Sequence, residues 1–274
     1  MFQATRQNRS RFEAAISMCE VIYVATVQSV RQSHSNALIA LLINIMQTMM
    51  LVVIFYLMFT LLGRDRVKIQ GDFVLYLLSG IFLYMTHIKS VGAVAGSGGP
   101  TSSMILHAPM NTFVAIASAS LGALYIQFLS VGAVLVVYDL ITDNVEFYNM
   151  KGAAAMLVMA WFSGICVGMV FLALKPWFPQ LSSMARQIYT RANMIASGKM
   201  FLANTLPSSM IVMFSWNPLF HIIDQARGYV FVNYNPHYSS TSYPFYLSLV
   251  LLVIGLLGEH YSRRHASVSW GARG

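Results

Sequence analysis

Charged residues are scarce in this sequence. Asp, Glu, Lys and Arg make up 9% of the 274 residues, whereas they make up about a quarter of an ordinary soluble domain. Hydrophobic residues make up 57% of the chain, and the mean hydropathy is +0.62. This balance argues against a soluble domain and predicts a chain whose main solvent is lipid.

Cysteine is also rare, with only Cys19 and Cys166 in the chain. Two cysteines this far apart argue against a disulfide framework and against a zinc pattern built on paired cysteines. The seven histidines are dispersed, and none has a carboxylate partner four residues away along a helix. The sequence therefore predicts no metal site.

A nucleotide-binding loop is missing as well. The stretch 92–103 reads GAVAGSGGPTSS and is rich in glycine, but Pro100 follows its last glycine where a P-loop has Lys. Without that lysine the loop lacks the group that reaches the phosphates of ATP. We therefore predict that the chain is not an enzyme, does not hydrolyse ATP by itself and binds no cofactor.

Long apolar runs fill most of the chain, and they predict an all-α polytopic membrane protein. A membrane-spanning helix needs about 20 mostly apolar residues. Six segments satisfy this length: 36–62, 73–95, 112–137, 152–174, 192–216 and 239–258. The fifth segment is the weakest because Lys199, Asn204 and Pro207 interrupt it.

Basic residues predict the orientation, because loops on the cytoplasmic side carry an excess of Lys and Arg. With both chain ends in the cytoplasm, ten lie inside (Arg6, Arg9, Arg11, Arg31, Lys175, Arg186, Arg191, Arg263, Arg264, Arg273) and five outside (Arg64, Arg66, Lys68, Lys151, Arg227). We therefore predict a cytoplasmic N-terminus over 1–35, a transmembrane domain over 36–262 and a cytoplasmic tail over 263–274. Lys89 then lies near the cytoplasmic end of the second span, where its stem can reach the headgroups; substrate binding is the alternative.

The N-terminal region contains an amphipathic pattern from about Phe12 to Arg31, with apolar residues such as Ile16 and Tyr23 at helical spacing. We predict a helix that lies on the membrane surface. The alternative is a soluble helix that packs on a partner. Because the basic residues cluster beside apolar segments, the net charge of +8 indicates lipid headgroups as partners rather than nucleic acid.

A short insertion follows the second span. After the glycines of 96–99, the segment 103–108 can form a two-turn helix with Met104, Ile105 and Leu106, followed by His107. An uncharged helix that carries methionine is suited to the groove of another protein. We predict that these four residues dock a cytoplasmic partner; packing on neighbouring cytoplasmic loops is the alternative.

A second insertion precedes the last span. Pro207 breaks the fifth apolar run early, and Trp216 leads into Asn217, a good helix N-cap, and Pro218, a good first helical residue. The helix that follows is too polar and too short to cross a bilayer. The two breaks together predict a helical hairpin that enters and leaves the membrane from the outer side.

The helix after Pro218 has one polar face, formed by His221, Asp224 and Gln225, opposite an apolar stripe. We predict that this face turns toward a water-filled cavity. We expect Arg227 to pair with Asp224 or with a neighbouring carbonyl, because an unpaired charge at that depth is costly. The alternative is a hairpin that only packs a dimer together.

The segment Trp216-Asn217-Pro218-Leu219, with His221 and Arg227 after it, resembles the extracellular re-entrant hairpin of ABC-2 type transporter permeases, especially those of capsular polysaccharide export systems. Six spans and an N-terminal interface helix extend the resemblance over most of the chain. It implies a homodimer in the bacterial inner membrane that pairs with a separate ABC subunit, which binds ATP and Mg²⁺. The polar face of the hairpin would then line the outer end of an export path.

The function that this resemblance implies is export of a lipid-linked, capsule-type polysaccharide. Within the same family, the alternative cargo is an O-antigen, a lipid or a drug. From a different class, the alternative is an ATPase-independent channel or a structural membrane protein. A neighbouring gene for a P-loop ATPase would separate the transporter from this last alternative, and neighbouring glycan genes would separate polysaccharide from drug.

Overall fold

A computed structural model of the chain describes residues 11–33, 37–61, 72–98, 112–142 and 147–265. Within these ranges the chain is helical and contains no strand, so the predicted all-α class is confirmed. The helices are α1 (Arg11–Ser33), α2 (Ala37–Leu61), α3 (Phe73–Gly96), α5 (Thr112–Thr142), α6 (Met150–Leu174), α7 (Pro179–Ala196), η1 (Ala203–Thr205), α8 (Ser208–Phe214), α9 (Pro218–Val230) and α10 (Ser242–His265).

Five of these helices are long and apolar enough to cross a membrane, namely α2, α3, α5, α6 and α10. They coincide with five of the six predicted spans. Asp72 caps the start of α3 by accepting a hydrogen bond from the Val74 amide, and Asn149 caps α6 in the same way through Gly152. The chain therefore has the character of a helical, multi-pass membrane protein.

The fifth predicted span, over 192–216, is not a single helix. Helix α7 ends at Ala196, and the chain turns at Gly198, which has a φ of 75°. A positive φ is easily adopted only by glycine and commonly ends a helix. The apolar residues beyond this turn belong to the short helix α8, which starts after Pro207. The break at Pro207 agrees with the prediction, whereas the turn at Gly198 was not predicted.

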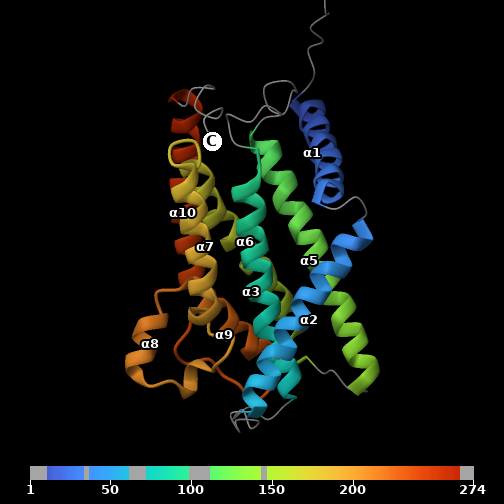
Figure 1. The fold of residues 1–274 in the computed structure, drawn as a ribbon, viewed down its shortest axis with the longest axis vertical. Helices are drawn as coiled ribbons and strands as arrows, with labels where there is room; N and C mark the ends of the chain where they lie inside the picture. The colour runs from blue at the N-terminus through green and yellow to red at the C-terminus, as the bar shows by residue number, and fades with distance from the viewer. Residues whose placement is uncertain (1–10, 34–36, 62–71, 99–111, 143–146, 266–274) are drawn as a thin grey trace, which may run out of the picture.

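Helix α3 lies at the centre of the bundle (Figure 1). In its most apolar stretch 83% of the residues are buried within the chain, against 28% in α2 and 22% in α10. Its closest neighbour is α6, and two glycines of α6 face α3. A β-carbon on Gly164 would lie 2.5 Å from the His87 carbonyl oxygen. A β-carbon on Gly168 would lie 2.8 Å from Val94 Cβ. Small residues at this interface let the two backbones approach each other.

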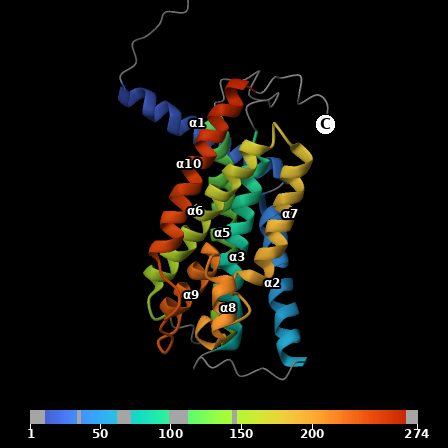
Figure 2. The same cartoon turned by 90° about the vertical axis from the view of Figure 1, so that its left-hand side faces the viewer.

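The two ends of the bundle differ. Figures 1 and 2 place α1 and the last turns of α10 at one end, and α8 with α9 at the other. Helix α7 ends above α8 and α9 in both views. Helix α1 packs along α5 but leaves Tyr23 and Val24 exposed. That α1 lies on a membrane surface, and that its end of the bundle is cytoplasmic, remain predictions.

Candidate functional site

The start of α9 joins it firmly to α7. Asn217 accepts a hydrogen bond from the Leu219 amide, as the N-cap prediction requires. Its side-chain nitrogen donates to the Asn193 side-chain oxygen (2.9 Å) and to the Ala196 carbonyl (3.0 Å), both on α7. The predicted cap is confirmed, and the same side chain also connects the two helices. The neighbouring Trp216 is exposed and accepts a hydrogen bond from Tyr243 through its carbonyl.

The predicted polar face of α9 is covered by the chain that follows it. Tyr234 and Ser239 both donate their hydroxyl hydrogens to the carboxylate of Asp224. Gln225 donates to the Ser239 carbonyl (2.9 Å). His221 accepts from the Ser240 amide on one ring nitrogen and lies 2.7 Å from the Ser215 carbonyl on the other.

His221 and Asp224 are buried and Gln225 is half-buried, so this face does not turn toward open space as predicted. The orientation differs because the segment 231–241 folds back over α9, which the periodicity of α9 cannot reveal. Burial, reinforced by the nearby Asp224 carboxylate, raises the pKa of the Tyr234 phenol above its ordinary value. Tyr234 therefore remains a hydrogen-bond donor to Asp224 at neutral pH.

We expect Asp224→Ala to destabilise the folded protein rather than to act only on transport. The substitution leaves the Tyr234 and Ser239 hydroxyls without their acceptor, and hydrogen bonds to a charged group contribute roughly 1.5–3 kcal/mol each. Thermal unfolding of the purified protein in detergent should show a clearly lower midpoint. Glu20→Ala, at an exposed position of α1, is the control and should leave the midpoint unchanged. Equal midpoints for the two variants would contradict the structural role of Asp224.

Arg227 holds the turn between α7 and η1. Its guanidinium is buried and donates to the carbonyls of Gly198 (2.9 Å), Phe201 (2.7 Å) and Lys199 (2.7 Å). The guanidinium carbon also lies 4.2 Å from the centre of the Tyr76 ring. Of the two predicted partners of Arg227, backbone carbonyls are therefore observed and Asp224 is not. Among the described residues, the one ion pair joins Glu259 to Arg263 and does not involve Arg227.

The same turn carries a second buried cation, Lys199. Its side chain is 1% exposed, and its ammonium has no hydrogen-bond partner within the described residues. The nitrogen lies 3.4 Å from the centre of the Tyr84 ring and 5.0 Å from that of Phe55. The faces of the two rings favour the charged form of Lys199. The sequence marks Lys199 only as an interruption of an apolar run.

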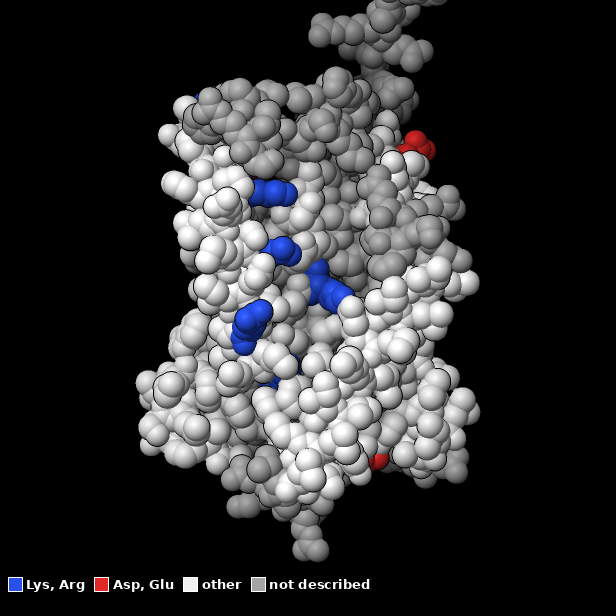
Figure 3. Space-filling view, viewed as in Figure 1, with Lys and Arg blue, Asp and Glu red and all other residues white. Residues whose placement is uncertain are grey.

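Further cations lie in a recess of the surface over α3 and α7. Figure 3 shows Lys and Arg side chains in a column there, with no Asp or Glu between them. The two helices carry three basic residues, Lys89 on α3 and Arg186 and Arg191 on α7, and no acidic one. We call these three residues the basic column. In the sequence, Arg186 and Arg191 count toward the cytoplasmic excess of charge, and Lys89 is predicted to reach the headgroups, with substrate binding as the alternative. Nothing in the sequence predicts that the three residues gather.

A cavity of about 720 Å³ lies between α1, α2, α3 and α5, next to the basic column. Lys89 and Gly92 are part of its wall. A β-carbon on Gly92 would lie 3.7 Å from the Arg186 guanidinium, so Arg186 reaches α3 at this point. Lys89 thus belongs both to the basic column and to the cavity wall, whereas Arg186 approaches the same stretch of α3 without lining the cavity.

Other predicted features have simpler positions. Pro207 directly precedes α8, and its carbonyl accepts hydrogen bonds from the Met210 and Ile211 amides. The predicted docking residues 104–107 lie outside the described residues. Within the described ranges, no three His, Cys, Asp or Glu residues are close enough together to hold a metal ion.

Comparison with known proteins adds no relative: no protein-family model matches the chain, and no curated protein matches it. The resemblance to ABC-2 type permeases therefore rests on the quoted segment and on the architecture. The structure shows a helical bundle with five helices of membrane-spanning length and a face with basic side chains that form no ion pair within the described residues.

Proposed function

We propose that this chain is the membrane permease subunit of an exporter that moves an anionic, lipid-linked polysaccharide out of the cytoplasm. A separate ABC subunit would bind and hydrolyse ATP, and two copies of the permease would enclose the path. Capsule-type polymers that carry carboxylate or phosphate groups are the cargo class that fits such a path. The bacterial inner membrane and a cytoplasmic position of both chain ends belong to the same proposal.

The observation that carries this proposal is the basic column. Basic side chains at membrane depth are costly, and those that occur usually face a water-filled cavity or mark a substrate path. Lys89 lies seven residues before the end of α3, so it is roughly 10 Å inside that helix. No carboxylate within the described residues forms an ion pair with the column. An anionic cargo would supply the missing countercharge.

Helix α7 has one apolar side and one polar side, and this arrangement supports the same function. Leu181, Met184 and Ile188 are exposed at helical spacing and form a side suited to lipid. Tyr189 and Asn193, on the other side, bond to His87 on α3 and to Asn217 on α9. A helix with a lipid side and a polar side is typical of the wall of a transport path. Docking of the ABC subunit on Met104, Ile105 and Leu106 remains part of the proposal.

The test removes charge from the column. In the native host, a double variant Lys89→Met and Arg186→Gln should reduce polymer at the cell surface at least about tenfold, since each lost ionic contact weakens binding by a similar factor. Lipid-linked polymer should accumulate inside the cell. The measurement is quantification of surface and intracellular polymer at matched levels of membrane protein.

Lys151→Gln is the matched control, because Lys151 is exposed at the start of α6, at the opposite end of the bundle. It should export normally. Normal export by the double variant would remove the basic column from the path, and with it the observation on which the proposed function depends.

A further inference from the structure

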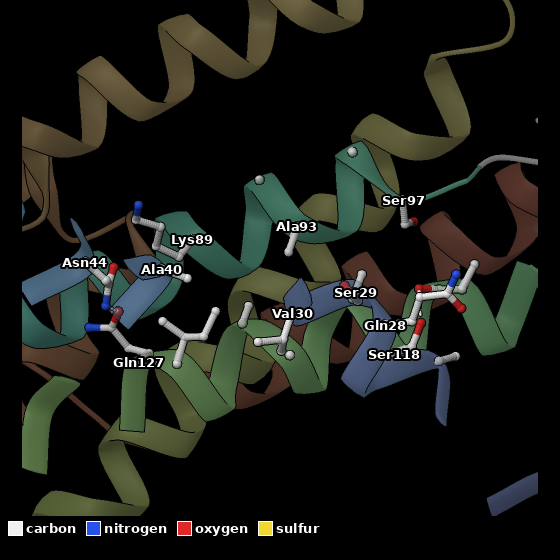
Figure 4. A pocket seen from close by; sticks show the side chains of 18 of the residues that line it. Gln28, Ser29, Val30, Ala40, Asn44, Lys89, Ala93, Ser97, Ser118 and Gln127 are labelled. Atoms are coloured by element: carbon white, nitrogen blue, oxygen red, sulfur yellow. Dashed lines mark hydrogen bonds between the residues drawn. The ribbon is translucent and has the colours of Figure 1, made fainter. Parts of the chain in front are cut away.

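The cavity between α1, α2, α3 and α5 has a wall of small and polar residues. Figure 4 shows Lys89, Asn44 and Gln127 at one end and Gln28, Ser97 and Ser118 at the other. Alanines such as Ala93 form the wall between these ends. Lys89 and Ser97 are eight residues apart on α3, so the cavity extends for about 12 Å along that helix. A volume of about 720 Å³ falls in the range of ordinary ligand sites.

Positive charge dominates this cavity. Lys89 is the one charged residue of its described wall, and its ammonium donates to the Gln47 side-chain oxygen, 2.5 Å away. Within the described residues Lys89 has no counterion, because its hydrogen-bond partner is a neutral amide. A cation without a counterion at one end of a cavity favours an anionic ligand.

The polar side chains beside Lys89 offer more hydrogen-bond donors than the neighbouring acceptors satisfy. Asn44 donates to the Gln127 side-chain oxygen (3.0 Å) and to the Ser130 hydroxyl (2.7 Å). The Gln127 side-chain nitrogen is buried and has no acceptor in the part of the chain that the structure describes. Unpaired buried donors are uncommon in native proteins and call for an explanation. A ligand rich in acceptor oxygens at this end would balance the cluster.

We infer that this cavity binds the headgroup of an anionic glycerophospholipid of the membrane. Its phosphate would lie beside Lys89, and the hydroxyls of its headgroup would extend toward Ser118 and Gln28. The outer faces of α2 and α5 expose Leu42, Met46 and Phe128, which are suited to the acyl chains. A zwitterionic headgroup fits less well, because its ammonium group would lie near the Lys89 ammonium.

This inference shares Lys89 with the proposed function but does not rest on that function. A structural lipid in this cavity requires only a membrane-embedded bundle with this arrangement of α1, α2, α3 and α5. It involves neither the cargo nor the ABC subunit. Retention of lipid by the purified chain can therefore fail while export remains as proposed, and export can fail while lipid retention remains.

The experiment is native mass spectrometry of the full chain, purified in a mild detergent and mixed with phosphatidylglycerol or phosphatidylcholine of identical acyl chains. We expect the wild-type chain to retain phosphatidylglycerol about tenfold better, as one charge-assisted contact allows. Lys89→Met should abolish this preference. Ala93→Phe, which fills the middle of the cavity, should lower retention of phosphatidylglycerol by a similar factor.

Lys151→Met is the control for loss of a positive charge outside the cavity, and it should keep the wild-type preference. Equal retention of the two lipids by the wild-type chain would overturn the inference without any variant being needed. An undiminished preference in Lys89→Met would also overturn it. If Ala93→Phe fails to fold, Ala119→Leu fills the same cavity from α5.

Discussion

Arg227→Lys is expected to unfold the end of the bundle that contains α8 and α9. The arginine donates three hydrogen bonds to carbonyls of one turn, and each such charge-assisted bond contributes roughly 1.5–3 kcal/mol. A lysine has a single point of attachment and cannot reproduce the planar fork of the guanidinium. We expect a loss of at least about 3 kcal/mol in the free energy of unfolding, together with little monodisperse protein after solubilisation.

The measurement is thermal unfolding by intrinsic fluorescence, with size-exclusion chromatography as a check on folding. Arg264→Lys is the matched control, because Arg264 is exposed on the last turn of α10 and should tolerate the change. If Arg227→Lys is as stable as this control, the three carbonyls do not depend on the guanidinium. The turn would then be held by other contacts.

Gly164→Val is expected to separate α3 from α6 and to prevent folding. Any β-carbon at this position meets the backbone oxygen of His87 at 2.5 Å and Ser90 Cβ at 2.8 Å. Neither atom can move without moving α3. The shift would also break the hydrogen bond between His87 and Ser163 (2.9 Å). Gly164→Ala, the milder change, should cost about 1–3 kcal/mol, as overpacked cores do.

Gly132→Ala is the control for this pair of variants. Gly132 also lies within a membrane-length helix, α5, but a β-carbon there meets no atom within 4 Å. Alanine is the better helix former, so Gly132→Ala should be neutral or slightly stabilising. Fluorescence-detected size-exclusion chromatography of detergent extracts distinguishes the outcomes. A monodisperse peak for Gly164→Val would show that α3 and α6 do not need this close approach.

The sequence predicted those features of the fold that depend on local signals. Five apolar runs became five helices, and the Asn217-Pro218 pair became the start of α9. Asn217 could be predicted because a cap acts on amides only two or three residues away. The prediction failed over 192–216, because average hydropathy did not register the turn at Gly198.

The candidate site could not be predicted in the same way, because its contacts join distant parts of the chain. The cage of Lys199 is made of Phe55 from α2 and Tyr84 from α3. The basic column combines α3 with α7. Periodicity identified the polar face of α9 correctly but not the segment that covers it. A pattern along one helix states which side is polar and leaves open what that side contacts.

Hydrogen bonds at the C-terminal end of α7 couple this helix mechanically to α9. Asn217 joins α9 to its last turn, and Arg227 fixes the carbonyls that follow. A rigid α7 of 18 residues is about 27 Å long. A displacement of the chain near Pro179 would therefore move the turn at Gly198 and the start of α9 together with α7, because the helix between them is rigid.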